Sequence, residues 1–133
     1  MSKFTGNEGE LVTASVVKEL ISPFQTKERA IKERKDNLVH AEFFGIKAFQ
    51  KLINQHENKC VGFRVYYGTR EEDHSGDEPV IGKGGLPTPR LIIIPVDCDG
   101  NDLTSEINSG IKDMAPNAQA LMGGPLCPHV CGK

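Results

Sequence analysis

The stretch that decides the fold reads VGFRVYY and runs from Val61 to Tyr67. Apolar and polar residues alternate along it, which is the two-residue period of a β-strand, and β-branched and aromatic residues favour strands. We therefore expect a half-buried strand whose apolar face holds Val61, Phe63, Val65 and Tyr67. Arg64 and Tyr66 share the opposite face and could together bind an anion. On an antiparallel sheet with one hydrated side, however, such residues are usually the solvent side, and that is our expectation.

A second strand is expected from Leu91 to Val96, where four consecutive residues are apolar. Pro95 cannot donate a hydrogen bond to a neighbouring strand, so it is expected at an edge or a bulge. The strongest helix is expected from Ala41 to Gln55, because apolar residues recur there at helical spacing. We expect this helix to cover one face of the antiparallel strand pair, since a lone two-stranded ribbon is marginal in water.

An earlier helix is indicated by an apolar stripe at helical spacing, made of Val12, Val16, Val17, Leu20, Ile21 and Phe24. Ser22 and Pro23 interrupt this stripe. Either a new helix begins there, because serine caps helices and proline suits the first turn, or one helix continues with a kink. The charged run from Lys27 to Asp36 is expected to be a solvated helix face.

These elements predict an α+β fold, in which N-terminal helices pack on a small antiparallel sheet. A short C-terminal helix from Thr104 to Asp113 and a loop-rich tail complete it. A chain of 133 residues is expected to form a single domain, residues 1–133. Residues 70–89 are expected to be a mobile insertion between the two strands, because this long connection has few apolar residues to anchor it.

Composition and charge exclude several classes of protein. With 38% hydrophobic and 26% charged residues, the chain is too apolar to be intrinsically disordered. Its 16 basic and 18 acidic residues nearly balance, which argues against a nucleic-acid-binding protein. No apolar run approaches the roughly 18 residues that cross a membrane, and the first residues lack the apolar stretch of a secretory signal. We therefore expect a cytoplasmic protein with neither nucleic acid nor membrane as a partner.

Two loops share part of a ligand-binding pattern and then depart from it. Asp97 to Asp102 places oxygen ligands at alternate positions, as a calcium loop does, but glycine is missing at the sixth position and glutamate at the twelfth. The segment is better explained as a tight turn after a strand. Gly82 to Gly85 lacks the spacing of a phosphate-binding loop. The four histidines are scattered and no nucleophile motif is present, so no catalytic residue is assigned.

The cysteines form the one group with distinctive chemistry. Cys127 and Cys131 lie near the end of the sequence in the segment CPHVC, while Cys60 lies beside the first predicted strand. In a reducing cytosol such soft ligands can hold zinc in a tetrahedral site, and the candidate ligands are His56, Cys60, Cys127 and Cys131. A redox-active or disulfide-bonded pair and plain unmodified thiols are the alternatives. Apart from this zinc, no cofactor is expected.

Four segments together resemble a family of small uncharacterised bacterial proteins. They are residues 41–45 (AEFFG), 62–68 (GFRVYYG), 96–103 (VDCDGNDL) and 127–131 (CPHVC), and their order is more specific than any one of them. The resemblance implies a shared fold and no particular catalytic activity. The sequence departs from the family pattern in its acidic insertion before Pro87 and in its extended, charged helical start.

The leading functional expectation is a non-catalytic cytoplasmic binding or adaptor domain, acting on an unknown protein partner or as a homodimer through a sheet edge. Such a domain should expose an apolar or aromatic patch and lack clustered titratable groups in a pocket. The alternative is a thiol- or zinc-dependent protein that uses the C-terminal cysteine pair.

Overall fold

The computed structural model describes residues 2–31, 38–56, 58–76, 79–82, 84–103 and 119–127. Within these residues the protein is α+β, with two helices and small antiparallel sheets. The elements in chain order are α1 (Ala14–Arg29), β1 (Ala41–Glu42), α2 (Ile46–Asn54), β2 (Gly62–Asp73), β3 (Val80–Ile81), β4 (Leu86–Val96) and β5 (Leu126–Cys127).

The chain divides into two compact units that are each discontinuous in sequence. The first unit comprises Met1–Glu8, Phe44–Gly68 and Leu91–Gly124. The second unit comprises Gly9–Phe43, Thr69–Arg90 and Pro125–Lys133.

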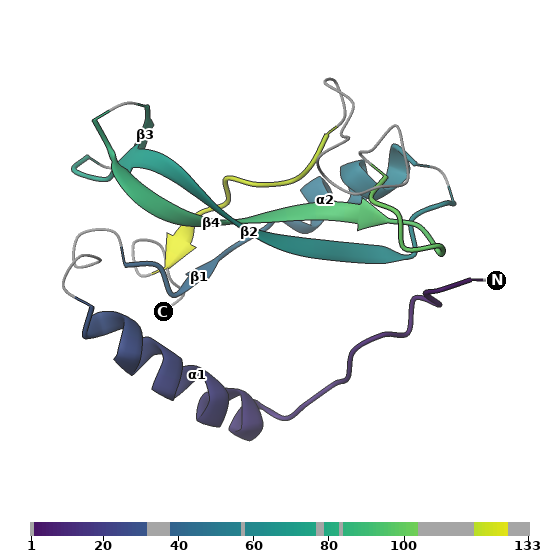
Figure 1. The fold of residues 1–133 in the computed structure, drawn as a ribbon, viewed down its shortest axis with the longest axis horizontal. Helices are drawn as coiled ribbons and strands as arrows, with labels where there is room; N and C mark the ends of the chain where they lie inside the picture. The colour runs from purple at the N-terminus through teal and green to yellow at the C-terminus, as the bar shows by residue number, and fades with distance from the viewer. Residues whose placement is uncertain are drawn as a thin grey trace. The chain divides into compact units, whose positions relative to one another are not determined.

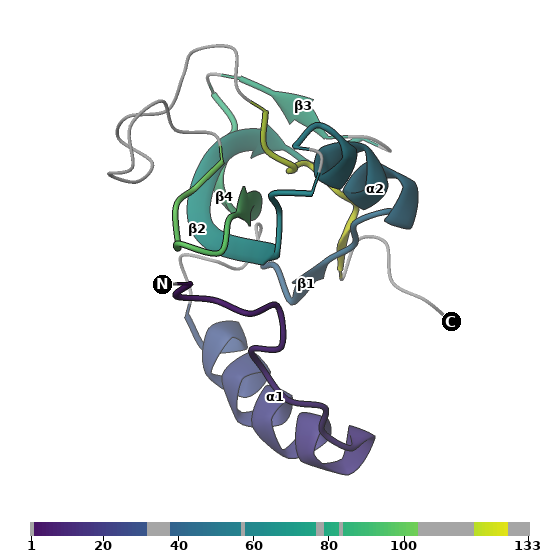
Figure 2. The same cartoon turned by 90° about the vertical axis from the view of Figure 1, so that its right-hand side faces the viewer.

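Two long strands, β2 and β4, are neighbours in a three-stranded sheet whose order is β3-β2-β4. They run side by side in Figure 1, and Figure 2 shows how strongly β2 curves. The prediction of two paired strands is confirmed, but both strands are longer than expected. Residues 70–73 and 86–89, predicted as part of the insertion 70–89, belong to β2 and β4. The remaining part includes β3, which pairs antiparallel with the end of β2.

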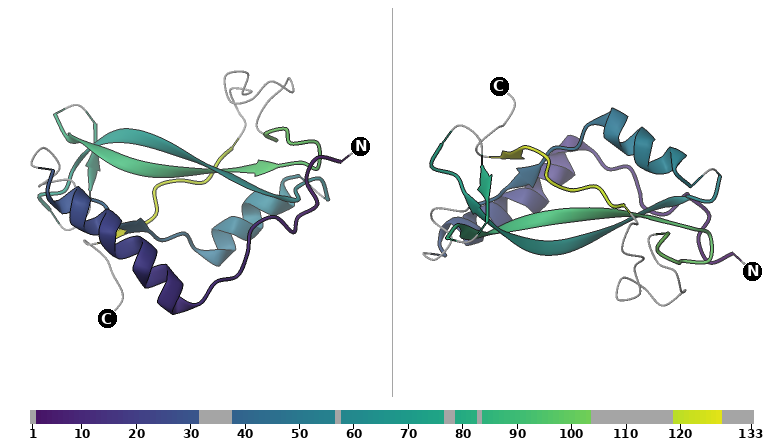
Figure 3. Two further views of the ribbon diagram at one scale, coloured as in Figure 1. Left: turned by 60° about the horizontal axis from the view of Figure 1, so that its bottom comes forward. Right: turned by 90° about the horizontal axis from the view of Figure 1, so that it is seen from above.

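The helix predicted from Ala41 begins later, because α2 starts at Ile46 after Gly45, whose backbone is extended. Ala41 and Glu42 form β1 instead, and this part of the prediction is wrong. β1 pairs antiparallel with β5, with Ala41 opposite Cys127 and Glu42 opposite Leu126. Figure 3 shows the two short strands together. A partner 86 positions away in sequence supplies their hydrogen bonds, which local periodicity does not reveal.

Aromatic rings join α2 to β2, in agreement with the prediction that this helix lies across the strands. The rings of Phe49 on α2 and Phe63 on β2 are 5.0 Å apart at a tilt of 59°, and Phe44 meets Phe49 edge to face. Buried apolar residues of the first unit include Leu52, Ile93, Ile94 and Val96.

The two faces of β2 differ from the prediction. Along its whole length the residues of the Phe63, Val65 and Tyr67 face are the more exposed ones, and Tyr67 is 92% exposed. The face that holds Arg64 and Tyr66 is the more buried one, so its assignment as the solvent side is wrong. The physical reason is that its polar residues have buried ionic partners, which are described below.

The N-terminal helix α1 is continuous through Pro23, so the alternative in which a new helix begins there is wrong, while a kink at Pro23 stays a prediction. Its N-cap is Thr13, whose side chain accepts a hydrogen bond from the Val16 backbone N–H. The predicted helix Thr104–Asp113 and the end of the predicted tail lie outside the described residues. No helix in the described part of the chain is long and apolar enough to span a membrane.

Candidate functional site

The predicted zinc ligands that the structure describes are divided between the two units. His56 follows the end of α2, and its Nε2 is buried without a hydrogen-bond partner among the described residues. The Cys60 thiol donates a hydrogen bond to the Gly62 carbonyl at 3.3 Å and is otherwise free. His56 and Cys60 belong to the first unit, whereas Cys127 belongs to the second. Cys131 lies outside the described residues.

Cys127 is disulfide-bonded. A sulfur in a disulfide is not a thiolate, and the thiolate is the form that binds zinc. The oxidised state of Cys127 therefore fits the disulfide alternative. Among the residues that the structure describes, no three His, Cys, Asp or Glu side chains are grouped as metal ligands. The zinc site stays a prediction for the reduced protein.

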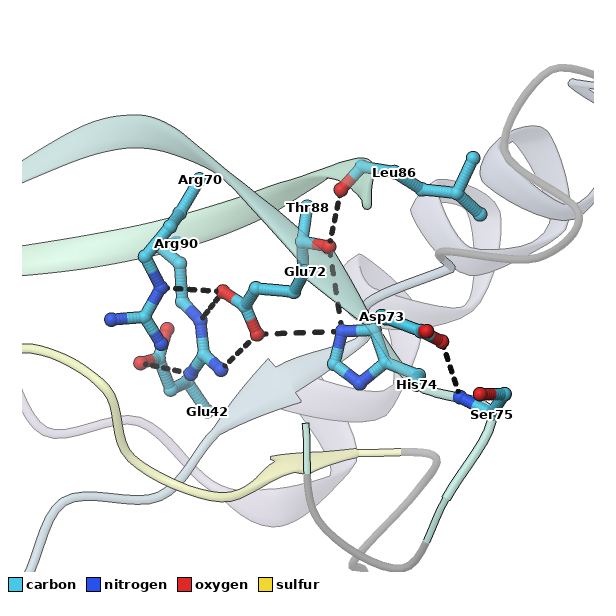
Figure 4. A network of polar contacts seen from close by, with 9 residues as sticks. All are labelled: Glu42, Arg70, Glu72, Asp73, His74, Ser75, Leu86, Thr88 and Arg90. Carbon is cyan, nitrogen blue, oxygen red and sulfur yellow. Dashed lines mark hydrogen bonds and ion pairs between the residues drawn. The ribbon is translucent and has the colours of Figure 1, made fainter. Parts of the chain in front are cut away.

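A buried network of charges lies in the second unit (Figure 4). The guanidinium of Arg90 on β4 donates to both carboxylate oxygens of Glu72 on β2, at 2.7 Å each. Its remaining terminal nitrogen donates to Glu42 of β1 at 2.9 Å. Glu72 is 0% and Arg90 3% exposed, so hydrogen bonds between these two charged groups replace the hydration that each would have in water.

Glu72 receives further contacts from residues two positions before and after it in the chain. Arg70 donates to it at 2.8 Å, and His74 Nε2 lies 3.4 Å from its other oxygen. Burial by itself raises the pKa of Glu72, but the hydrogen bonds and charges of Arg90 and Arg70 outweigh burial and lower the pKa to about 2. Glu72 is therefore ionised at neutral pH.

The network also places a hydroxyl beside an imidazole, since Thr88 Oγ1 lies 3.4 Å from His74 Nε2. The same ring nitrogen faces both Thr88 and Glu72, whereas a catalytic triad uses both nitrogens of the histidine. Thr88 is fully buried and donates to the Leu86 carbonyl. This arrangement links the residue after β2 to β4, and it lacks the geometry of a catalytic triad.

A second ionic cluster lies in the first unit around Asp102, which is 2% exposed. One of its oxygens accepts from Arg64 Nη1 and the other from the Tyr66 hydroxyl. Arg64 Nη2 also donates to the Gly100 carbonyl at 3.3 Å. Burial, together with the hydrogen bond to Asp102, raises the pKa of Tyr66. The polar face of β2 is therefore paired, which explains its burial.

The turn before Asp102 positions the Asp102 carboxylate. Asp97 Oδ1 accepts from the backbone N–H groups of Asp99 and Asn101 at 3.0 and 2.9 Å, and Gly100 has a φ of 86°. The prediction of a tight turn in this segment is confirmed.

A cavity of about 220 Å³ lies in the first unit beside Arg64. Its apolar lining comes from Phe4, Val61, Phe63 and Val96, and Glu8 contributes a carboxylate. The N-terminal segment is held beside this cavity, because the backbone N–H groups of Lys3 and Phe4 both donate to the Cys98 carbonyl. Sequence reasoning missed this cavity, since residues 1–8 carry no periodic pattern.

The apolar stripe of α1 is an exposed feature of the second unit. Its helical members are between 37% and 70% exposed, and α1 buries none of its residues: the stripe consists of Val16, Val17, Leu20, Ile21 and Phe24. The helical spacing of the stripe was predicted correctly, and the helix leaves this stripe exposed.

No family model, no curated protein and no solved structure matches the chain. The resemblance to small bacterial proteins therefore stays a prediction.

Proposed function

We propose that this chain is a non-catalytic binding domain that docks a partner protein through the apolar stripe of α1. The observation that carries the proposal is the exposure of all five large apolar side chains on one helix face. Contiguous apolar surface of this kind is typical of protein interaction sites. The cluster of Glu72 and Arg90 supports a binding role rather than catalysis, because its charged groups are occupied by one another.

The geometry of the stripe suits a groove on another protein. Val17, Leu20 and Phe24 follow the i, i+3, i+7 spacing with which amphipathic helices anchor in apolar grooves. A helix of 16 residues is about 24 Å long, which is enough to present all three anchors. Each large apolar side chain contributes about 1.5–3 kcal/mol when it passes from full exposure to full burial. Five half-exposed ones therefore offer about 5 kcal/mol to an interface.

Affinity capture with paired variants tests this proposal. The double variant Leu20→Ser, Phe24→Ser removes two anchors, and the double variant Lys18→Ser, Glu19→Ser changes two exposed neighbours outside the stripe with no change in net charge. We expect the wild type and the control to retain the same partner, while the anchor variant retains at least about tenfold less. Equal retention by both variants, or no partner for the wild type, would contradict the proposal.

A second candidate function is thiol chemistry, and the disulfide of Cys127 favours it. The cytoplasmic location that we propose is reducing, and disulfides there are usually transient and serve catalysis or redox sensing. In this alternative the pair Cys127 and Cys131 cycles between a disulfide and a dithiol, and the dithiol, together with His56 and Cys60, is the state that holds zinc.

Elemental analysis and thiol titration separate the two candidates. Reduced protein purified without added metal is expected to carry about one zinc per chain if the thiol hypothesis holds, and to lose it in the variant Cys127→Ser, Cys131→Ser. Absence of metal, together with four freely titrating thiols after reduction, would refute the zinc form.

A further inference from the structure

The cavity of the first unit combines three kinds of lining. Four apolar side chains, Phe4, Val61, Phe63 and Val96, form most of it, and Arg64 and Glu8 add one positive and one negative charge. All of these residues belong to the first unit. The cavity is therefore independent of α1 and of the function proposed above.

Arg64 retains hydrogen-bonding capacity for a ligand. A guanidinium carries five N–H donors. Asp102 accepts one through Nη1, the Gly100 carbonyl accepts one through Nη2, and the Tyr66 hydroxyl oxygen is a third partner, which leaves two donors. Among contacts between described residues, Asp102 thus binds Arg64 through one carboxylate oxygen, because its other oxygen binds the Tyr66 hydroxyl. A carboxylate that enters the cavity can accept hydrogen bonds from the guanidinium N–H groups of Arg64 that these partners do not use.

Glu8 is fixed in its ionised form on the same cavity. Its carboxylate accepts from the Thr5 hydroxyl at 3.0 Å and from the Gly6 backbone N–H at 3.1 Å. The two oxygens of a carboxylate accept about four hydrogen bonds. The Gly6 N–H is the donor on Oε2, so this oxygen keeps capacity for a cationic group.

We propose that this cavity binds a free amino acid with an apolar side chain. The α-carboxylate pairs with Arg64, the α-ammonium pairs with Glu8, and the side chain lies against Phe4, Val61, Phe63 and Val96. The volume agrees with this size of ligand: 220 Å³ equals the liquid volume of about seven water molecules. A branched amino acid with eight or nine non-hydrogen atoms fills such a space.

Isothermal titration calorimetry with the full chain at pH 7 tests the proposal. The probe is L-leucine, and two matched compounds each lack one charge: 4-methylpentanoate has no ammonium and leucinamide has no carboxylate. We expect L-leucine to bind with a Kd below about 1 mM and each matched compound to bind at least about tenfold more weakly. Absence of leucine binding, or equal affinity for 4-methylpentanoate, would overturn the proposal.

Variants of Glu8 and Arg64 test the role of each charged side chain in leucine binding. Glu8→Gln removes an exposed charge and is expected to weaken leucine binding about tenfold without altering the fold. Arg64→Lys keeps a positive charge for Asp102 but loses the planar fork, so binding should weaken by a similar factor. The variant Leu20→Ser, Phe24→Ser should bind leucine as the wild type does. Unchanged affinity in both charge variants would contradict the proposal, whatever the fate of partner binding through α1.

Discussion

Replacing Arg90 by methionine is expected to destabilise the protein severely. Methionine resembles the aliphatic part of the arginine side chain in length and apolar character, but it lacks the guanidinium. That cation binds Glu72 twice and Glu42 once. Arg70 still contacts Glu72, while Glu42 loses the ion pair that Arg90 supplies. Breaking a buried ion pair by removing one partner costs about 3–5 kcal/mol, because the other charge stays buried. A domain of this length has a total stability of roughly 7–20 kcal/mol, so the loss is a large fraction.

Urea unfolding followed by far-UV circular dichroism measures this loss, since the chain has no tryptophan for fluorescence. The control is Arg29→Met on the exposed end of α1, which should change the free energy of unfolding by less than about 0.5 kcal/mol. The double variant Glu72→Met, Arg90→Met should be more stable than Arg90→Met alone, because it also removes the buried Glu72 carboxylate, which in the single variant has only the Arg70 ion pair left. A loss below about 1 kcal/mol for Arg90→Met would refute the reasoning.

Three further predictions follow from the same clusters. Because the pKa of Glu72 is lowered to about 2, its stabilising contribution is complete above pH 4.5 and is lost as the pH falls toward 2. When the free energy of unfolding is measured as the pH is lowered through this range, it should decrease by about 3 kcal/mol less in Glu72→Gln than in the wild type. The Gly85→Ala variant places a Cβ 2.6 Å from the Glu72 backbone and should cost about 1–3 kcal/mol in urea unfolding, whereas Gly62→Ala, with open space around its Cβ, should cost much less. Ultraviolet titration should show a tyrosine that ionises above pH 10, and Tyr66→Phe should abolish that transition.

The elements with a strong local period were predictable from the sequence. The alternation in residues 61–67 identified β2, and the phenylalanines at helical spacing identified α2 and its packing against Phe63. The helical spacing of the α1 stripe and the turn at Asp97 were also correctly predicted. Local spacing dictates these features, so one sequence contains the necessary information.

The sequence alone did not indicate which face of β2 is buried. Alternation groups Arg64 with Tyr66, but their partner Asp102 lies 38 and 36 positions away. In the second unit, Arg90 binds Glu42 across 48 positions. Pairing over such distances satisfies charges that would otherwise demand solvent, and no local pattern reveals it. The same applies to β1, whose partner strand begins at Leu126.

The free energy of unfolding of the variant Leu20→Ser, Phe24→Ser tests the central claim most directly. If the apolar face of α1 is a docking surface, the isolated protein should lose less than about 1 kcal/mol relative to the control Lys18→Ser, Glu19→Ser. If the face is instead part of a core, each substitution removes a buried side chain and the two together should cost at least about 4 kcal/mol. A loss of that size would contradict the account.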